Sequence, residues 1–472
     1  MSANDFIALL PLIVAGAAVI AVMLLIAFWR SHRGSLLLTV AALAAAIGVL
    51  FVPHSGSTQV TPLLIMDDYA RFFIGLIFAS TVAMALLAYG YLEGHTTNPE
   101  EFYMLMLLAA LGAAVLAASV HFASFFLGLE LLSVSLYSLI AYSRAQTNGI
   151  EAGLKYLVLA AVSAAFLLFG MALVYAKTGT MEFAGLSSWA GERSVVLLTG
   201  LGLMVVGIGF KLALFPFHLW TPDVYQGAPA PVTAFVATVS KGAMVAVLVR
   251  LMAGVTLQSS GALIMIFSLI AIASMFVGNL LALLQDNVKR LLAYSSIAHL
   301  GYLLVAFLAS GKHALAAVIF YLVAYFVAIL IAFGAVTLLS DDEREADRLE
   351  DYRDLFWRRP WLAGSFTAAL LSLAGIPLTA GFVGEFYVLL AGVNSTLWAL
   401  VLILVINSAI GLFYYLRVVA IMFSQPAATA RTHVTHQSPA GSLVMAVLTL
   451  CLLWLGLYPG TLLDIIYAIP MP

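Results

Sequence analysis

Charge is scarce in this sequence. Only 9% of its 472 residues are Asp, Glu, Lys or Arg, while 64% are hydrophobic and the mean hydropathy is +1.10. Soluble domains carry about 25% charged residues, so this composition excludes an ordinary soluble protein and predicts an all-α polytopic protein of the lipid bilayer. The net charge is only −2 and no basic tract occurs, so we expect no binding to nucleic acid.

Cysteine is nearly absent as well. The single cysteine, Cys451, lies in an apolar run, which excludes a disulfide within the chain and a cysteine-based metal cluster. The sequence also has no CxxC motif, no His/Cys ligand spacing and no GxGxxG between a strand and a helix. Gly200 falls in an apolar run, where a small residue favours close helix packing. We therefore expect no metal, iron–sulfur cluster, flavin or nicotinamide in this chain.

Long apolar runs are what the sequence has instead. A spanning helix needs ~20 apolar residues, and this rule predicts about fourteen spans. Met1–Asp5 lacks the basic region of a cleavable signal peptide, so we expect the first run to be a retained helix. The expected spans are 6–29, 35–52, 69–91, 102–118, 120–142, 153–176, 195–215, 231–252, 262–284, 289–309, 314–339, 361–390, 397–423 and 441–458.

A faint internal echo suggests how these spans are organised. Tyr156-Leu-Val recurs as Tyr321-Leu-Val, and each is followed further along by Phe-Gly. We interpret this echo as two five-helix repeats. The predicted parts are N-terminal helices 1–3 in residues 1–100, a first repeat of helices 4–8 in 101–255, a second repeat of helices 9–13 in 256–425, and a last helix in 426–472.

Two of the expected spans are interrupted. The seventh runs into a segment between Lys211 and Pro231 that holds four prolines and His218, and the twelfth is broken between Ala374 and Glu385 by glycines and a proline. Proline removes a backbone donor, and the polar backbone left by a break is tolerated in a membrane only beside protein or water. Paired breaks in the two halves of a chain indicate an ion pathway.

Lysine and arginine are distributed unevenly between the loops. Eleven lie on the side of the first loop and five on the other, which predicts a cytoplasmic first loop and both termini on the outer side. The one sizeable polar segment, residues 340–359, lies on the predicted cytoplasmic side and interleaves Asp, Glu and Arg with Leu349, Phe356 and Trp357. We expect a short amphipathic helix there, with a solvated loop as the alternative.

Four ionisable residues lie in otherwise apolar stretches: Glu130, Lys155, Lys211 and Lys241. A charge near the bilayer centre costs at least ~2.5–3.5 kcal/mol, so several of them together indicate ion or proton movement. Burial and an opposite charge shift a pKa in opposing directions, so a Glu/Lys pair that forms and separates is a protonation switch. The alternatives are a static pair that holds two helices in register and, for Lys155, a side chain that reaches the interface.

Four further residues are candidates for the same path. The ordinary pKa of histidine suits His218 and His299 to proton relay, with a satisfied core residue as the alternative for each. Lys289 lies at a charged helix end, where an interfacial anchor is the alternative. Glu385 follows the break in the twelfth span and is the only acid of the second half that we expect to be buried; a water-exposed helix end is its alternative.

Six motifs lie around these candidate residues. They are G-L-E-L-L-S at 128–133, E-A-G-L-K-Y-L at 151–157, F-K-L-A-L-F-P-F-H at 210–218, W-T-P-D-V-Y-Q-G-A-P at 220–229, S-K at 240–241, and Q-D-N-V-K-R-L-L-A-Y-S-S-I-A-H-L-G-Y at 285–302. Together they resemble a known family, the antiporter-like N subunits of the bacterial proton-pumping NADH:quinone oxidoreductase, respiratory complex I. The resemblance covers essentially the whole chain, and the motif that begins with Trp220 is the most specific.

The resemblance implies a fourteen-helix subunit with two inverted five-helix repeats and broken seventh and twelfth helices. It also implies neighbouring membrane subunits of the K and M types, a lateral helix from the L-type subunit, and location in the bacterial inner membrane. In such a complex NADH, FMN, the iron–sulfur clusters and quinone belong to other subunits.

The resemblance also assigns roles by matching position. Glu130 and Lys211 would form the gating pair, Lys241 would be the central lysine, and Lys155 would belong to the same polar axis. The second-half path would include His299 and Lys289. One position departs from the family, because N subunits typically carry a lysine after the twelfth-helix break, whereas this chain, like M subunits, carries an acid, Glu385.

The function we expect is therefore proton translocation coupled to quinone reduction elsewhere in the complex, by a translocase subunit without a redox centre. A subunit of a multisubunit Na⁺/H⁺ antiporter is the alternative within the same superfamily. An inert membrane scaffold is the alternative from another class, and it would tolerate neutral substitutes for the buried charges.

Overall fold

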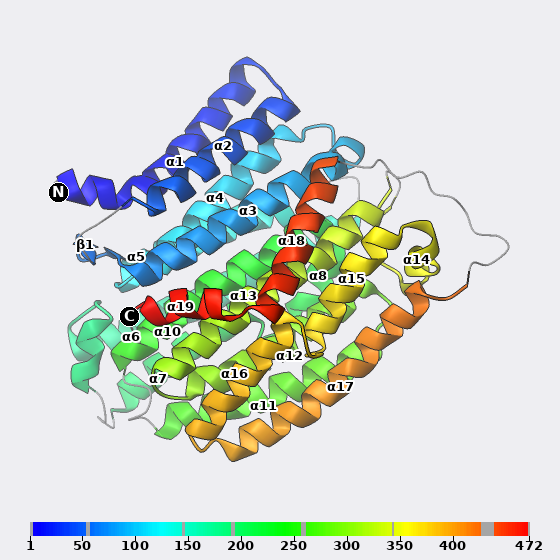
Figure 1. The fold of residues 1–472 in the computed structure, drawn as a ribbon. Coiled ribbons are helices and arrows are strands. Elements are labelled where there is room, and N and C mark those ends of the chain that lie inside the picture. Colours follow the sequence, from blue (N-terminus) through cyan, green and yellow to red (C-terminus); the bar gives the residue numbers. More distant parts are fainter. Residues whose placement is uncertain are drawn as a thin grey trace.

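Helices make up nearly all of the chain in its computed structural model (Figure 1). The structure describes residues 3–52, 57–143, 147–189, 194–255, 261–341, 344–425 and 439–470. Within these ranges thirteen helices are long and apolar enough to cross a membrane, and the shorter apolar helices α15 and α16 together make one further, interrupted span. The expected all-α fold with fourteen spans is therefore confirmed.

The elements follow one another along the chain with short connections. They are α1 (Ala3–Phe28), α2 (His32–Leu50), β1 (Thr58–Val60), β2 (Leu64–Met66), α3 (Asp68–His95), α4 (Glu100–Ala118), α5 (Phe122–Ile140), α6 (Thr147–Thr178), η1 (Ala184–Trp189), α7 (Val195–Leu212), α8 (Trp220–Gly227), α9 (Ala230–Phe235), η2 (Val236–Ser240), α10 (Lys241–Val255), α11 (Gly261–Leu283), α12 (Val288–Leu308), α13 (Lys312–Leu339), η4 (Leu349–Tyr352), α14 (Leu355–Arg358), α15 (Pro360–Leu373), α16 (Ala380–Asn394), α17 (Trp398–Met422), α18 (Pro439–Leu457) and α19 (Gly460–Ala468).

Some of the sequence-based predictions concern residues outside the ranges that the structure describes. Arg144, Arg193 and Arg431, which were counted for the orientation, lie outside the described residues, as do the boundary positions 256 and 426 of the predicted parts. The orientation and the four-part division therefore stay predictions.

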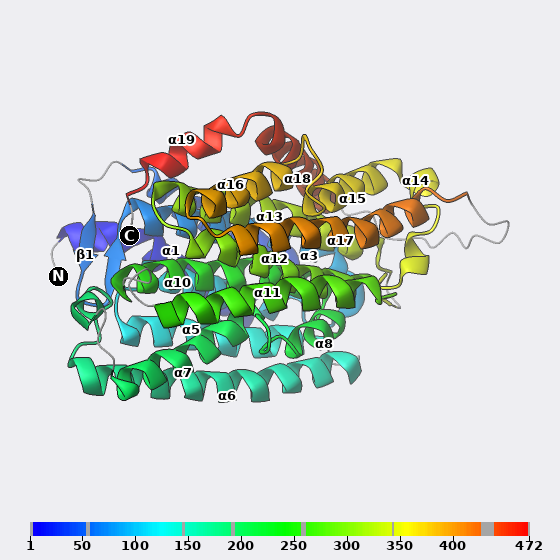
Figure 2. The same ribbon diagram turned by 90° about the horizontal axis from the view of Figure 1, so that it is seen from below.

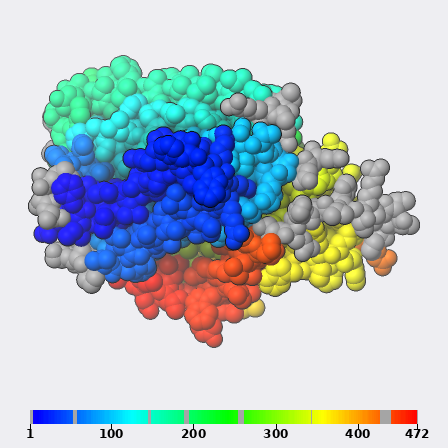
Figure 3. All heavy atoms as spheres, turned by 90° about the horizontal axis from the view of Figure 1, so that it is seen from above, coloured from blue at the N-terminus to red at the C-terminus, as the bar shows by residue number. Residues whose placement is uncertain are grey.

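The centre of the bundle is formed by α9–α10, α12 and α13. In the most apolar stretch of each, 94% of the residues are buried, against 28% in α1 and α2. The latter two helices pack against α3 and α4 on the outside of the bundle and form the blue surface in Figure 3. α6 and α7 lie side by side at one edge, on the opposite side of the bundle from α19 (Figure 2). Charges on the central helices are thus far from lipid.

The same packing order occurs in both halves of the bundle. α4 packs against α5 and α6 against α7, as α11 packs against α12 and α13 against α15 and α16. Because equivalent spans are five crossings apart, they run through the membrane in opposite directions, and the two repeats are inverted.

Both broken helices are interrupted by residues in the left-handed backbone region. Ala213, with φ of +57°, follows α7, and the chain then forms the short helices α8 and α9 instead of one continuous span. After α15, Gly375 and Leu378 have φ of +67° and +74°, before the Thr379 hydroxyl caps α16. A left-handed residue ends the regular ladder of helical hydrogen bonds. Polar backbone is therefore available beside the bundle centre in both halves.

The polar segment 340–359 is not an amphipathic helix, and that prediction was wrong. Its described part contains only the 3₁₀ turn η4 and the single turn α14. The intervening backbone bonds to the start of α12: the Val288 N–H donates to Asp347 O (2.6 Å), and the Leu349 N–H donates to Asp286 O (3.0 Å). The first N–H groups of a helix lack partners within it, and here the loop supplies one. The segment is thus held over the N-terminus of α12.

Glycines bring neighbouring helices into backbone contact. A Cβ on Gly112 of α4 would lie 2.6 Å from Leu132 N of α5, and one on Gly128 would lie 3.1 Å from Gly112 O. In the α6–α7 pair, a Cβ on Gly170 would lie 2.6 Å from Gly200 O. Only a residue without a Cβ permits this approach. The close packing expected for Gly200 is confirmed.

A buried ion pair fixes α10 to α3. Arg250 donates to both carboxylate oxygens of Asp67 (2.9 Å each), and its guanidinium lies 4.9 Å from the centre of the Tyr69 ring. We expect Arg250→Leu to lower the free energy of unfolding by about 3–5 kcal/mol, because it leaves the Asp67 charge buried and uncompensated. Thermal aggregation of the detergent-solubilised protein measures this effect.

The control is a second change in the same protein. Asp67→Asn removes the orphaned charge but keeps an oxygen that can cap α3, so Arg250→Leu combined with Asp67→Asn should recover most of the loss. An unchanged aggregation temperature for Arg250→Leu alone would show that this pair does not stabilise the fold.

Candidate functional site

Four of the predicted basic residues lie buried in the centre of the bundle. Lys241 and Lys289 are completely buried, and Lys211 and His299 are only 3% exposed. They come from three elements, the end of α7, the start of α10, and α12, and α12 alone carries two of them. The prediction that Lys211 and Lys241 are buried is therefore confirmed, whereas Lys289, which was expected at a charged helix end, is buried as well. Each of the four groups must be stabilised by polar partners.

Lys211 is hydrogen-bonded but not paired with the predicted acid. Its Nζ donates to Ser133 Oγ on α5 (2.7 Å) and to the Tyr156 hydroxyl on α6 (3.3 Å). Glu130 lies one turn before Ser133 on α5, and its buried Oε1 has no hydrogen-bond partner among the described residues. A neutral hydroxyl thus lies beside the ammonium of Lys211. The Glu130–Lys211 switch stays a prediction.

Lys241 lies directly after a single π-helical turn, η2. Its Nζ donates to Ser296 Oγ on α12 (2.5 Å), and that oxygen also accepts a hydrogen bond from the Tyr325 hydroxyl (2.6 Å). The Tyr225 ring lies beneath the ammonium, 5.6 Å away. Single π turns widen a helix and occur frequently at functional sites. A lysine with hydroxyl partners and no buried counter-ion can release its proton more readily than a paired one.

His299 lies between two tyrosines. Its Nδ1 is 2.5 Å from the Tyr321 hydroxyl on α13, and its Nε2 is 2.9 Å from the Tyr415 hydroxyl on α17. The Tyr415 hydroxyl also hydrogen-bonds Ser295, one residue before Ser296. An imidazole with a hydroxyl on each nitrogen can accept a proton on one side and donate one on the other.

Glu385 is buried rather than exposed at a helix end. Its carboxylate accepts a hydrogen bond from Ser408 (3.0 Å) and packs against the backbone of Gly375, where a Cβ would come within 2.3 Å of it. A cavity of about 10 Å³, lined by Glu385, His299 and Tyr321 among others, joins the acid to the histidine. One water molecule needs about that volume, so a single water could link the two groups.

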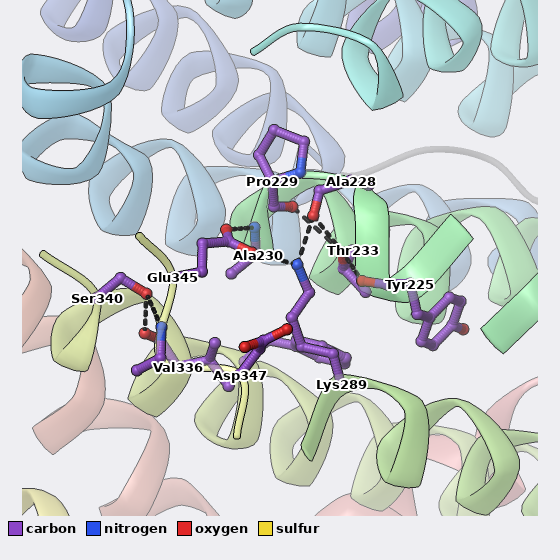
Figure 4. A network of polar contacts seen from close by, with 12 residues as sticks. Tyr225, Ala228, Pro229, Ala230, Thr233, Lys289, Val336, Ser340, Glu345 and Asp347 are labelled. Carbon is purple, nitrogen blue, oxygen red and sulfur yellow. Dashed lines mark hydrogen bonds and ion pairs between the residues drawn. The ribbon is translucent and has the colours of Figure 1, made fainter. Parts of the chain in front are cut away.

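Lys289 forms the network shown in Figure 4. Its Nζ donates to the carbonyl of Ala228 (2.6 Å) and forms an ion pair with Glu345 in the 340–359 segment. The alternative of an interfacial anchor does not hold for Lys289, because its side chain is completely buried inside the protein. The expectation that Glu385 is the only buried acid of the second half is also wrong, since Asp354 is buried and the Glu345 side chain is only 9% exposed.

His218 and Lys155, the last two predicted site residues, have different surroundings from the residues described above. His218 is buried, its ring stacks on Phe215 at 5.5 Å, and its Nδ1 has no hydrogen-bond partner among the described residues. Lys155 is 43% exposed and pairs with Glu151 and Asp223, each at 2.8 Å. The prediction that Lys155 lies deep in an apolar stretch was wrong: its stem extends to charged partners at the edge of the bundle, as snorkelling lysines do.

Hydroxyl groups are the part of the site that charge-based reasoning missed. Ser133, Tyr156, Ser296, Tyr321 and Tyr415 contact the charged groups directly. The repeated Tyr-Leu-Val motif could have indicated two of them. Its first tyrosine, Tyr156, hydrogen-bonds Lys211, and its second, Tyr321, hydrogen-bonds His299. Alternating amines, hydroxyls and an imidazole can pass protons but cannot store electrons, and no cluster of three His, Cys, Asp or Glu suited to a metal occurs in the described part of the chain.

Comparison with known proteins agrees with this architecture. The family profile described as "NADH:quinone oxidoreductase/Mrp antiporter, TM" matches residues 119–411. A chain of respiratory complex I from Thermus thermophilus, solved with bound aureothin, is 34% identical, with a TM-score of 0.84 over 98% of this chain and 100% of that one.

Two more distant structures share the fold. A chain of the archaeal membrane-bound sulfane sulfur reductase is 24% identical, with a TM-score of 0.86 over 98% of this chain and 96% of its own. A chain of the Mrp complex from Dietzia sp. DQ12-45-1b is 21% identical, with a TM-score of 0.86 over 99% and 97%.

The buried groups Lys211, Lys241, Lys289, His299 and Glu385, with their hydrogen-bond partners, are called the polar axis below. The fold and this polar axis define a multi-pass membrane subunit of the antiporter-like class. The chain belongs to the NADH:quinone oxidoreductase/Mrp antiporter transmembrane family. The resemblance inferred from the sequence motifs is thereby confirmed, and the N-type assignment is consistent with these matches.

Proposed function

We propose that this chain is the N-type membrane subunit of a bacterial NADH:quinone oxidoreductase and translocates protons across the inner membrane. The observation that carries the proposal is the buried set of Lys211, Lys241, His299 and Glu385, each of which is hydrogen-bonded to at least one serine or tyrosine hydroxyl. Burying this many ionisable groups is costly, and proton transfer is the function that uses them.

In this function the chain supplies the path and other subunits supply the energy. Protons would pass between Lys211, Lys241 and His299 through hydroxyls and water, and would leave by way of Glu385. NADH, FMN, iron–sulfur clusters and quinone would be bound by other subunits. The lipid-exposed α1–α2 and α6–α7 edges are available for neighbouring subunits of the K and M types and for a lateral helix of the L type.

A subunit of a Na⁺/H⁺ antiporter is the second candidate, supported by the shared fold of the Mrp complex chain. The identity of 34% to the complex I chain, against 21% to the Mrp chain, favours the oxidoreductase. Affinity purification from native membranes tests the assignment. Co-purifying iron–sulfur subunits with NADH-driven proton uptake would support it, whereas Na⁺-dependent proton exchange without those subunits would support the antiporter.

The Glu130–Lys211 switch gives a prediction of its own. Glu130→Gln and Lys211→Met should each lower NADH-driven proton uptake by inside-out vesicles on the order of tenfold, because neither variant can alternate between a paired and a separated charge. Uptake is normalised to the amount of assembled complex. The control is Glu151→Gln, which changes an exposed acid at the bundle edge. Native uptake in both test variants would leave only a structural role for this pair.

A further inference from the structure

Glu345 is held from several sides. Its Oε1 accepts hydrogen bonds from the Tyr91 hydroxyl on α3 (2.6 Å) and from the Ala230 N–H at the start of α9 (2.7 Å). Its Oε2 forms the ion pair with Lys289 (Figure 4). The His95 ring stacks on Tyr91 at 4.0 Å. The three donors fix the position of the Glu345 carboxylate beside Lys289.

This carboxylate also borders open space. A cavity of about 1200 Å³ lies under the 340–359 segment, and most of its lining side chains are polar. Glu345 is among its lining residues, whereas Lys289 is not and has no exposed surface. Glu345 therefore lies between a volume large enough for many waters and a lysine side chain that is completely buried.

Lys289 is also aligned with the rest of the axis. Ser296, which hydrogen-bonds Lys241, lies seven residues further along α12. Seven residues are two helical turns, so Lys289 and Ser296 share one face of α12 about 10 Å apart. Tyr225 lies between the level of Lys289 and the level of Ser296. Its carbonyl accepts a hydrogen bond from Thr233, which lies beside Ala228, and its hydroxyl is 3.5 Å from Ser296 Oγ.

We propose that Glu345 is the proton-collecting group at the mouth of this axis and that its ion pair with Lys289 is the gate. The inference rests on the proposed function and deepens it, because it assigns a place of uptake and a residue outside the membrane-spanning helices. The mouth lies on the side that the charge distribution predicts to be cytoplasmic.

The transfer conserves protons and charge. The Lys289 ammonium gives a proton through water and Ser296 to Lys241, when Lys241 is a neutral amine. This leaves a neutral Lys289 amine beside the Glu345 carboxylate. Glu345 then takes a proton from water in the cavity and passes it to Lys289. One proton moves inward in each cycle, and the ion pair forms again. While the pair is closed, both groups are charged and no further proton can pass.

A purely structural role is the competing explanation, since Glu345 also ties the segment to the bundle. Asp347 offers a matched test, because it anchors the same segment to Asn287 and does not touch Lys289. Glu350 offers a second test, because it is an exposed acid lining the same cavity. Glu345→Asp keeps the carboxylate, and Tyr91→Phe removes one hydrogen bond while the charge stays.

The experiment measures the initial rate of NADH-driven proton uptake by inside-out membrane vesicles, per assembled complex. Glu345→Gln should lower this rate on the order of tenfold, whereas Glu345→Asp and Tyr91→Phe should keep most of it. Asp347→Ala and Glu350→Gln should keep the native rate. Limited proteolysis at the arginines of the segment reports separately whether it is still seated.

Lys241→Met in the same assay separates this inference from the proposed function. Native uptake in Glu345→Gln, with uptake lost in Lys241→Met, would overturn the gate and leave the proposed function standing. Native uptake in Lys241→Met would overturn the proposed function itself. An equal loss in Asp347→Ala or Glu350→Gln would overturn the gate in favour of loop anchoring or of general charge at the mouth.

Discussion

Lys241→Met is expected to lower proton translocation on the order of 100-fold or more, the largest effect of any single change in this chain. Lys241 is completely buried and bonded to Ser296, so no neighbouring base can replace it. Lys241→Arg should be nearly as damaging, since arginine keeps the charge but does not release its proton. Proton uptake by inside-out vesicles, compared with the amount of assembled complex, measures both variants.

The control is Lys312→Met, which removes an exposed lysine at the start of α13. It should leave uptake unchanged. If the arginine variant at position 241 pumped at the native rate, then charge alone would be required there, and Lys241 would not be a relay.

Glu385→Gln should lower proton translocation on the order of tenfold, whereas Glu385→Lys should retain part of it. Glutamate and lysine can each gain and lose a proton, but glutamine cannot. The cavity between Glu385 and His299 holds room for about one water, so either titratable group could exchange a proton with the histidine. The same vesicle assay applies, with assembly measured alongside.

Ser408→Ala is the matched control, because it removes the hydroxyl that donates to Glu385 and leaves the carboxylate in place. It should cost far less than Glu385→Gln. Full pumping by the glutamine variant would reduce Glu385 to a packing residue beside Gly375, and equal losses in the glutamine and lysine variants would show that only a carboxylate works there.

The fold could be predicted largely from the sequence, since a bilayer imposes a simple length rule on apolar runs. The breaks after Lys211 and before Glu385 could also be predicted, because prolines and glycines are clustered there and such clusters interrupt a helix. The segment 340–359 was misjudged because its composition is amphipathic on average. Its backbone bonds to α12, a contact that depends on tertiary structure.

Of the candidate site, only the ionisable residues could be predicted from the sequence, and not the residues that hydrogen-bond them. A buried lysine is conspicuous in an apolar helix, but the serine or tyrosine that accepts its hydrogen bond is unremarkable in any sequence. Glu345 could not be singled out, because it is one of several acids in a polar loop and its partner Lys289 is 56 residues away. Lys155 was predicted to be buried but lies at the surface, because an apolar sequence around a lysine does not prevent its flexible side chain from reaching charged partners there.

The glycine contacts limit how any switch in this protein can work. Glu130 lies two residues from Gly128, whose backbone rests directly on α4, and the helix that carries Lys211 rests on α6 at Gly200. Helices in such contact cannot slide or rotate without backbone collision. The contacts therefore hold α5 to α4 and α7 to α6, so Glu130 and Lys211 belong to two separate helix pairs. The two residues can meet by rotamer changes of their side chains or by movement of one pair against the other, and not by the sliding of a single helix.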